Sequence, residues 1–331
     1  MDAAIIGGGS WGSAFALHLG RLRLKTQLWV WEKEILGELL ETRQNGVFLP
    51  GFSFPAEVTF SSDIRETASS AGVLFVAVPS RFCRRVFEEI APVLRGDQTV
   101  ISLTKGIEEN SLKRMTEVMN EVFPQRSYPR LAVLSGPSFA REVAEKHPTA
   151  VVIASTDAEA ARTVQHLVSD IHFRAYTSDD VAGVELAGAL KNVIAVACGI
   201  SDALCFGHNT RAALITRGIA EMTRLGLRLG AKKETFLGLA GIGDLVLTCT
   251  ARLSRNYHVG FELGKGRPLA EILGETRMVA EGVTTTMSVR DLARREKVEM
   301  PISTEVYQIL YEKKDPRASL GDLMLRTLKV E

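Results

Sequence analysis

The sequence has no segment that predicts a membrane span or a secretion signal. No run approaches eighteen apolar residues, and the N-terminus lacks both a basic region and a long apolar stretch. Forty basic residues stand against thirty-nine acidic ones, so the net charge of +1 gives no general affinity for nucleic acid or an anionic membrane. These absences predict a cytoplasmic protein without a nucleic-acid partner, in which any anion is bound by local Lys or Arg side chains.

Cysteine and histidine are few, and neither occurs in a paired motif. Cys83, Cys198, Cys205 and Cys249 form no CxxC pair, and three of them lie among apolar or small residues. Free thiols in a reducing compartment are the simplest explanation. The six histidines stand singly, without an HExxH motif, so the sequence predicts no metal site.

The strongest motif lies at the N-terminus, where a short apolar run precedes closely spaced glycines. Residues 3–6 suit a buried parallel strand, and Gly7, Gly9 and Gly12 have the GxGxxG spacing of a dinucleotide site. The first glycine permits a sharp turn, the second lets the backbone approach a pyrophosphate, and the third lets the next helix pack closely. We expect Ser10 to cap this helix, whose N-terminus would face the phosphates.

The following segment favours a nucleotide site over a purely structural glycine turn. Residues 14–23 continue as an amphipathic helix, and residues 26–31 predict a second strand that ends at Glu32. A βαβ unit places the acid that binds the adenine ribose at about this position. The alternative is that Glu32 caps the next helix and that Trp31 belongs to the core.

Strand and helix signals then alternate up to about residue 178. Further strands are predicted at 73–78, 99–103, 131–134, 150–154 and 172–176, helices at 81–94 and 157–168, and a loop at 46–51. From Asp179 the strand signals stop, and a helix over 181–202 that is apolar on most faces begins a helical segment. The sequence therefore predicts an α/β fold: a Rossmann-like, doubly wound, mostly parallel sheet domain over 1–180 and an all-α C-terminal domain over 181–331.

Candidate site residues occur after the predicted strands and within the helical segment. Lys105 follows a very apolar strand, at the edge where an open parallel sheet binds ligands, although a solvated surface lysine is the alternative. Lys191 lies inside the apolar helix, as a catalytic group or as half of a structural ion pair. Asp244 is an acidic residue in an apolar run, directly after two glycines. Further along, the cluster at 254–256 has the side chains to bind a phosphate or a carboxylate. The alternative is that Arg255 is an exposed loop residue.

Several of these blocks, in order and over essentially the whole chain, resemble those of NAD(P)-dependent glycerol-3-phosphate dehydrogenase. The blocks lie at 7–12, 102–106, 134–140, 184–193, 243–244 and 254–256. The resemblance implies reversible reduction of dihydroxyacetone phosphate to sn-glycerol 3-phosphate by hydride transfer, a reaction that supplies phospholipid synthesis. It therefore implies a nicotinamide cofactor and a small phosphate substrate.

The resemblance also implies roles for individual residues. Lys191 corresponds to the proton acceptor, and we place Lys105 and Asp244 with it in the catalytic set. The residues expected at the cofactor are Gly7, Gly9, Ser10, Trp11, Gly12, Trp31, Phe48, Lys105, Ala140, Arg255, Val279 and Glu281. The residues expected at the substrate are Lys105, Gly136, Ser138, Lys191, Asn192, Asp244, Thr248, Ser254, Arg255 and Asn256.

The end of the second strand departs from the family pattern. Many bacterial members carry a His or Arg where this chain has Trp31, and that basic group would bind the 2′-phosphate of NADP. An indole can stack on adenine and Glu32 would repel a phosphate, although Lys33 is close in sequence. We therefore expect NAD to be preferred, with NADP as the alternative cofactor.

The role implied for Lys191 requires an unusual proton affinity. A free lysine has a pKa of about 10.4, too high for a base near neutrality. Burial and the positive charge of Lys105 would lower the pKa of Lys191, and Asp244 would oppose that shift.

Two other functions are open on the residues alone. A dehydrogenase of β-hydroxy acids also joins a dinucleotide domain to a helical domain with a central lysine, and the cluster at 254–256 would then bind a carboxylate. A non-catalytic NAD sensor would need the glycine turn but not Lys105, Lys191 and Asp244 together. The apolar helical domain is compatible with a homodimer.

Overall fold

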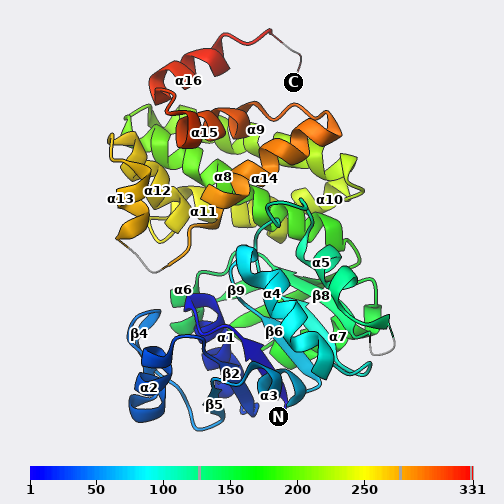
Figure 1. Ribbon diagram of the computed structural model, residues 1–331. Helices are drawn as coiled ribbons and strands as arrows, with labels where there is room; N and C mark the ends of the chain where they lie inside the picture. Colours follow the sequence, from blue (N-terminus) through cyan, green and yellow to red (C-terminus); the bar gives the residue numbers. More distant parts are fainter. Residues whose placement is uncertain (126–127, 276–277, 329, 331) are drawn as a thin grey trace. The chain divides into compact units, whose positions relative to one another are not determined.

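The computed structural model describes residues 1–125, 128–275, 278–328 and 330. The chain divides into two compact units, one formed by Met1–Gly106 with Lys113–Glu185 and the other by Ile107–Leu112 with Leu186–Glu331. The first unit is built around a sheet, and the second consists of helices (Figure 1).

The sheet of the first unit has eight strands in the order β10-β9-β8-β7-β6-β1-β2-β5. The strands are β1 Ala3–Ile6, β2 Thr26–Trp29, β5 Val58–Ser61, β6 Val73–Val76, β7 Thr99–Ser102, β8 Arg130–Ser135, β9 Thr149–Ala154 and β10 Phe173–Ser178. Neighbouring strands pair in parallel except β8 and β9, so β9 and β10 run opposite to the other six. The mostly parallel sheet expected from the alternating sequence pattern is confirmed.

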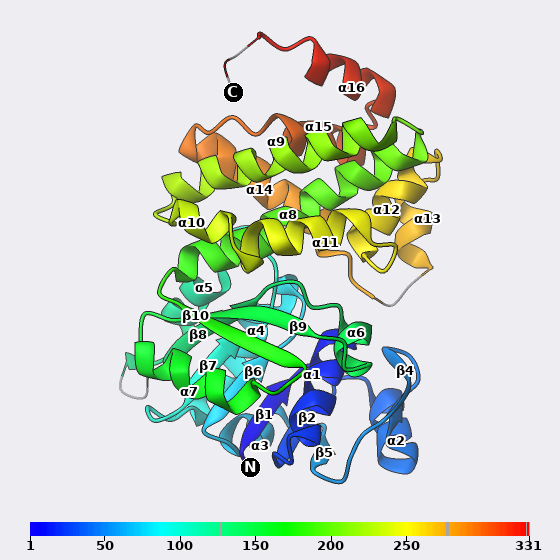
Figure 2. The same ribbon diagram turned by 180° about the vertical axis from the view of Figure 1, so that it is seen from behind.

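Helices cover both faces of this sheet (Figures 1 and 2). They are α1 Ser10–Arg21, α2 Lys33–Thr42, α3 Ile64–Ser69, α4 Ser80–Ile90, α5 Met115–Val122, α6 Ala140–Ala144 and α7 Ala158–Val168, with a short 3-10 helix at Ala91–Val93. Within β1, Ala3 and Ile5 belong to a buried cluster with α1 and α7, whereas Ala4 and Ile6 belong to one with α3 and α4. Because successive side chains of a strand point to opposite faces, a uniformly apolar strand needs a helix layer on each side.

Two local predictions differ from the structure, and one strand has no counterpart in the predictions. Gly9 is the N-cap residue of α1, and Ser10 is the first helical residue, so Ser10 does not cap the helix. The expected loop at 46–51 contains β4, Leu49–Ser53, which pairs antiparallel with β3, Gln44–Asn45. The edge strand β5 was not predicted, because Val58 is its one buried residue and its apolar signal is correspondingly weak.

The regular structure described in the second unit is helical, and its first helix, α8, begins within the first unit, which ends at Glu185. Its helices are α8 Val181–Ala203, α9 Gly207–Arg228, α10 Lys233–Phe236, a π-helical turn Leu239–Gly243, α11 Asp244–Thr250, α12 Arg255–Gly264, α13 Leu269–Gly274, α14 Glu281–Glu296, α15 Pro301–Glu312 and α16 Pro316–Met324. By length and composition α8 could cross a membrane, but 89% of its most apolar window is buried within the protein. It is therefore built like the core helix of a globular protein.

The backbones of α8 and α12 are in direct contact. A Cβ on Gly199 of α8 would overlap the carbonyl oxygen of Tyr257, and a Cβ on Gly260 of α12 would overlap that of Val196. Any larger side chain at either glycine would push the two helices apart. This contact fixes where α12 begins relative to α8, and both helices carry candidate site residues.

A buried carboxylate fixes the start of α15. Glu221 of α9 accepts hydrogen bonds from the amides of Ile302 at 2.6 Å and Ser303 at 3.2 Å, so it acts as an N-cap supplied by another helix. Burial raises the pKa of Glu221 to about 7, against the effect of these hydrogen bonds. The folded chain therefore binds a proton at Glu221 more tightly than the unfolded chain does.

This raised pKa predicts a pH-dependent contribution to stability. The contribution of Glu221 is fully present below the pKa of about 4.5 that the group has when unfolded, and it is lost as the pH rises through about 7. The shift corresponds to about 3 kcal/mol. Urea unfolding from pH 5 to 8 should show a steeper loss of stability for the wild type than for Glu221→Gln, whose amide does not titrate.

Glu312→Gln, at an exposed position of α15, is the matched control and should retain the wild-type pH dependence. Parallel pH profiles for the wild type and Glu221→Gln would contradict the assignment.

Candidate active site

The glycine turn after β1 has the geometry that a bound nucleotide requires. Gly7 has φ +119°, and a Cβ there would lie 2.7 Å from the carbonyl oxygen of Ala77. A Cβ on Gly12 would overlap the carbonyl oxygen of Gly7, so α1 can pack this closely only with glycine there. A Cβ on Gly9 would meet no atom within 4 Å, which leaves the backbone approachable at this point.

A buried asparagine that the sequence did not single out supports this turn. The Asn45 amide nitrogen donates to the Gly8 carbonyl at 2.9 Å and to the Ser13 hydroxyl at 3.0 Å. Its amide oxygen accepts a hydrogen bond from the Phe48 backbone at 2.9 Å. Asn45 therefore fixes the position of the segment that carries Phe48 against the glycine turn. It lies in the two-residue strand β3, just before the segment 46–51 that the sequence predicts to be a loop, and no pattern marks it.

The polar groups around the turn fit a dinucleotide. The indole nitrogen of Trp11 is buried and has no hydrogen-bond partner within the described part of the chain. No side chain caps the first turn of α1, and unpaired amides at a helix N-terminus favour a phosphate. A ligand with an acceptor oxygen near Trp11 would satisfy an indole donor that has no partner among the residues the structure describes.

The end of β2 presents an aromatic ring to solvent. Trp31 is 63% exposed, so the alternative that it belongs to the core is wrong. Glu32 occupies the N-cap position of α2, but its side chain makes no capping hydrogen bond. Trp31 and Glu32 are thus both accessible on the nucleotide-binding unit.

The carboxyl ends of β7 and β8 lie together, as expected. The Lys105 ammonium donates to the Gly136 carbonyl at 2.8 Å, and the Ser138 hydroxyl donates to the same oxygen at 2.9 Å. Gly136 has φ +140°, a conformation that favours glycine. Thr104, which the sequence did not single out, holds this edge by donating to the Val78 carbonyl at 2.7 Å.

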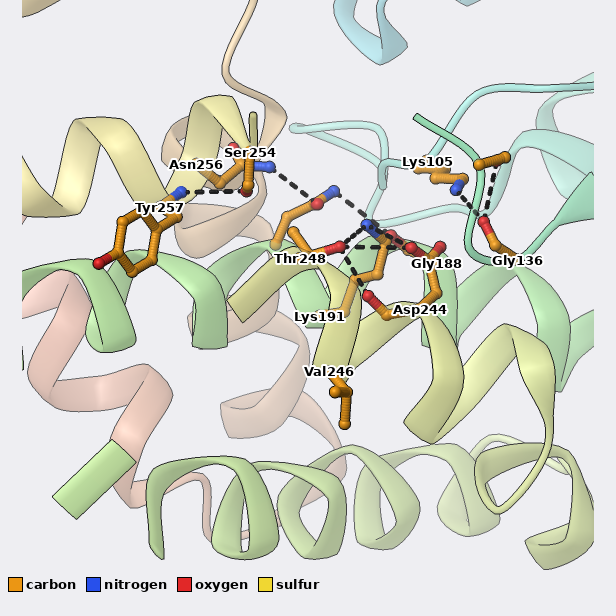
Figure 3. A network of polar contacts seen from close by, with 12 residues as sticks. Lys105, Gly136, Gly188, Lys191, Asp244, Val246, Thr248, Ser254, Asn256 and Tyr257 are labelled. Atoms are coloured by element: carbon orange, nitrogen blue, oxygen red, sulfur yellow. Dashed lines mark hydrogen bonds and ion pairs between the residues drawn. The ribbon is translucent and has the colours of Figure 1, made fainter. Parts of the chain in front are cut away.

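In the helical unit, Lys191 lies in a buried polar group with Asp244 and Thr248 (Figure 3). The lysine is 5% exposed and Asp244 1%. The ammonium is 3.1 Å from the Asp244 carboxylate and donates to the Thr248 hydroxyl at 2.7 Å. Thr248 donates in turn to the Asp244 carbonyl at 2.6 Å. The ion pair that the sequence allowed for Lys191 is therefore present, and its partner is another candidate site residue.

The glycines before Asp244 explain how it reaches this position. A Cβ on Gly241 would overlap the backbone of Phe236, so the π-helical turn folds tightly onto α10. The turn ends at Gly243, and α11 then begins at Asp244 itself. The tight backbone turn that these glycines allow therefore determines where the Asp244 carboxylate lies.

A second polar chain joins three helices of the same unit. The Asn256 amide nitrogen donates to the Asn192 side-chain oxygen at 2.8 Å, and the Gly282 backbone donates to the Asn256 oxygen at 2.8 Å. The side-chain amides of Asn192 and Asn256 are therefore both hydrogen-bonded within the protein. Asn256 links the lysine helix α8 to the start of α14, where Val279 and Glu281 lie.

Arg255 differs from its two neighbours at the start of α12. Ser254 caps the helix by accepting a hydrogen bond from the Tyr257 amide at 3.2 Å, and Asn256 points into the helical unit. Arg255 is exposed. The cluster at 254–256 therefore provides one cap, one internal link and one accessible guanidinium.

Glu185, on the same helix as Lys191, contacts a different set of residues. Its carboxylate accepts hydrogen bonds from Arg114 at 2.7 Å and from the Thr116 amide and hydroxyl at 2.8 and 2.6 Å. Burial raises the pKa of Glu185, and the charge of Arg114 opposes that shift. Glu185 thus fixes the start of α5 rather than pairing with the lysine.

The cysteines of the chain are free thiols. Cys83, Cys198 and Cys249 are buried free thiols, and Cys205 is exposed. Among the residues that the structure describes, no group of three or more His, Cys, Asp or Glu side chains is placed to hold a metal ion.

These features define a class of protein. A doubly wound sheet whose first strand ends in a glycine turn binds a dinucleotide, and a helical unit with a buried lysine and aspartate supplies a group that can transfer a proton. Together they indicate a dinucleotide-dependent dehydrogenase.

The chain belongs to the NAD-dependent glycerol-3-phosphate dehydrogenase family. The family's N-terminal model matches residues 2–161 and its C-terminal model residues 180–321. The chain is 53% identical over 327 residues to the glycerol-3-phosphate dehydrogenase [NAD(P)+] of Geobacter sulfurreducens, covering 99% of this chain and 98% of that protein. The corresponding protein of Geobacter sp. strain M21 is 50% identical over 328 residues, with coverage of 99% and 98%. A crystal structure of the Coxiella burnetii glycerol-3-phosphate dehydrogenase superposes with a TM-score of 0.94 at 38% identity, covering 98% of this chain and 99% of that one.

The glycine geometry predicts a selective effect of adding one methyl group to α1. Gly12→Ala would force the helix away from Gly7 and weaken NADH binding by about tenfold or more, since the turn could no longer hold its shape. NADH fluorescence titration measures the change. Gly37→Ala in α2, where a Cβ meets nothing within 4 Å, is the control and should bind NADH normally. Normal NADH affinity in Gly12→Ala would contradict this account of the turn.

Proposed function

We propose that this chain catalyses the reversible NAD(P)-dependent reduction of dihydroxyacetone phosphate to sn-glycerol 3-phosphate, and so supplies phospholipid synthesis. The observation that carries the proposal is the buried Lys191–Asp244 pair, 3.1 Å apart, in a chain that matches the family over nearly its whole length. A sensor of NAD would have no use for such a pair.

The first unit is proposed to hold the cofactor. The glycine turn and the first turn of α1 would bind the pyrophosphate, and Trp31 would face the adenine. Ser10, Trp11, Phe48 and Ala140 belong to the same proposed set. When bound, the nicotinamide supplies the hydride.

Lys191 is proposed to transfer the proton. During reduction the substrate oxygen gains negative charge, and an ammonium beside it stabilises that charge and donates the proton. Asp244, with Thr248, holds the amine in one position and favours its charged form. In the reverse direction the same nitrogen, once neutral, accepts the proton of the alcohol.

Arg255 is proposed to bind the substrate phosphate. An exposed guanidinium at the start of α12 can donate two parallel hydrogen bonds to a phosphate. Asn256, buried beside it, would keep the start of α12 in register with Lys191 through Asn192. Binding energy at the phosphate would thereby orient the reacting carbon. Lys105, Gly136 and Ser138 complete the proposed substrate set.

One assay tests the function itself. The expected result is loss of NADH absorbance with dihydroxyacetone phosphate, no such loss with the keto-acid counterparts of β-hydroxy acids, and no formation of NADH from NAD+ and a β-hydroxy acid. Turnover of the acids alone would overturn the proposal. The preference for NADH, supported by Trp31 and Glu32, belongs to the same proposal, as do a cytoplasmic location and a homodimer.

The lysine assignment predicts a loss of turnover without loss of cofactor binding. Lys191→Ala should lower kcat by about 10²-fold or more, because proton transfer by a positioned group is removed. NADH titration should give near wild-type affinity. Because the change leaves Asp244 buried without its cation, Lys191→Ala/Asp244→Asn should restore stability but not turnover. Lys233→Ala, at an exposed position, is the control, and near-normal turnover of Lys191→Ala would refute the assignment.

The arginine assignment predicts an effect on the substrate rather than the fold. Arg255→Ala should raise KM for dihydroxyacetone phosphate by about tenfold or more, through the loss of charged hydrogen bonds. Steady-state kinetics at saturating NADH measure it. Arg252→Ala removes an exposed guanidinium three residues earlier and should leave KM unchanged. A change confined to NADH affinity in Arg255→Ala would contradict the substrate role.

A further inference from the structure

We propose that Arg85 binds the 2′-phosphate of NADP(H) and is the residue through which the enzyme accepts this cofactor despite the acidic Glu32. The proposal rests on the proposed function only in assuming that the glycine turn holds a nicotinamide dinucleotide. It concerns the first unit alone.

The topology brings Arg85 to the end of β2. Strands β2 and β6 lie on either side of β1, so the segments that follow them meet beside the glycine turn. Gly7 donates a backbone hydrogen bond to Trp29 at 3.2 Å, and Ala77 donates one to Ile6 at 2.8 Å, which fixes both segments against β1. Helix α4 begins just after β6, and Arg85 lies in its second turn.

The guanidinium of Arg85 lies over the exposed indole of Trp31. Its central carbon is 5.7 Å from the ring centroid, within the range of a cation–π contact. A cation supplied by α4 is therefore present beside the exposed end of β2.

The charge of Arg85 is available to a ligand. Arg85 is exposed and forms no ion pair with any described residue. Arg84, one position earlier, instead pairs with Glu121 at 2.8 Å. The Glu32 carboxylate likewise has no cationic partner within the described part of the chain, so neither group neutralises the other.

The two groups favour different cofactors. A carboxylate at the end of the second strand accepts hydrogen bonds from the ribose hydroxyls of NADH and repels a phosphate at that position. A planar guanidinium can donate two parallel hydrogen bonds to the phosphate that NADPH carries there. With Glu32 favouring NADH and Arg85 compensating for the phosphate, the enzyme uses both cofactors, and Arg85 sets how large the preference is.

The test compares the two cofactors in the full-length enzyme. Arg85→Ala should lower kcat/KM for NADPH by about tenfold or more and change that for NADH by less than about twofold. Arg85→Lys should give an intermediate value for NADPH, because a lysine keeps the charge but not the paired hydrogen bonds. Arg84→Ala, on the same helix, is the control and should leave both cofactors unchanged.

A binding measurement gives a readout that does not depend on turnover. Adenosine 2′,5′-bisphosphate should bind the wild type more tightly than adenosine 5′-monophosphate, and Arg85→Ala should abolish most of that difference. Equal losses for NADH and NADPH in Arg85→Ala would overturn the proposal, since they would indicate a role at the adenine or in the fold. Unchanged NADPH kinetics, or no difference between the two adenosine nucleotides in the wild type, would overturn it too. Failure of the proposed reaction would instead appear as absent turnover in the wild type with either cofactor.

Discussion

The buried ion pair between Lys191 and Asp244 is the interaction around which the polar groups of the helical unit are arranged. Taking an ammonium and a carboxylate out of water costs several kcal/mol each, roughly, and attraction between them repays this only with good geometry and further hydrogen bonds. Thr248 provides one such bond to the lysine and is itself fixed by the Asp244 carbonyl. Such a pair is weak evidence for stability alone, because apolar residues of the same size would serve as well. The proposed function gives the pair a purpose that stability does not, because proton transfer needs an amine held at one fixed position.

More of the fold than of the site could be predicted from the sequence, because the apolar pattern of a segment reflects its burial. Apolar periodicity reports burial directly, so β1, β7 and α8 were located from sequence to within a residue or two. The weak strand β5 and the hairpin of β3 and β4 were missed because most of their side chains remain partly or fully exposed. Their backbone pairing is decided by neighbours in space, which a linear pattern does not contain.

Among the site residues, the sequence indicated which were unusual but not which contacts they make. Lys191 and Asp244 stood out because charges are rare in apolar runs, yet their pairing depends on the turn at 239–243 that starts α11. Asn45 and Thr104 were missed because an isolated amide or hydroxyl looks ordinary until its partners are known. Asn256 is predicted to bind substrate, and its amide also contacts Asn192 and Gly282, which no spacing rule could reveal.

Close backbone contact explains how these polar groups keep their positions. Where two helices touch through glycine, as α8 and α12 do at Gly199 and Gly260, neither can slide or rotate without a clash. A hydrogen bond such as that between Asn256 and Asn192 then operates at a fixed separation instead of pulling two mobile elements together. Since a buried amide without partners would be costly, the amides in turn favour the one helix register that satisfies them. Apolar packing could stabilise several registers of an all-round apolar helix like α8, and it is the combination of glycine contacts and buried amides that selects the one in which the lysine meets its aspartate.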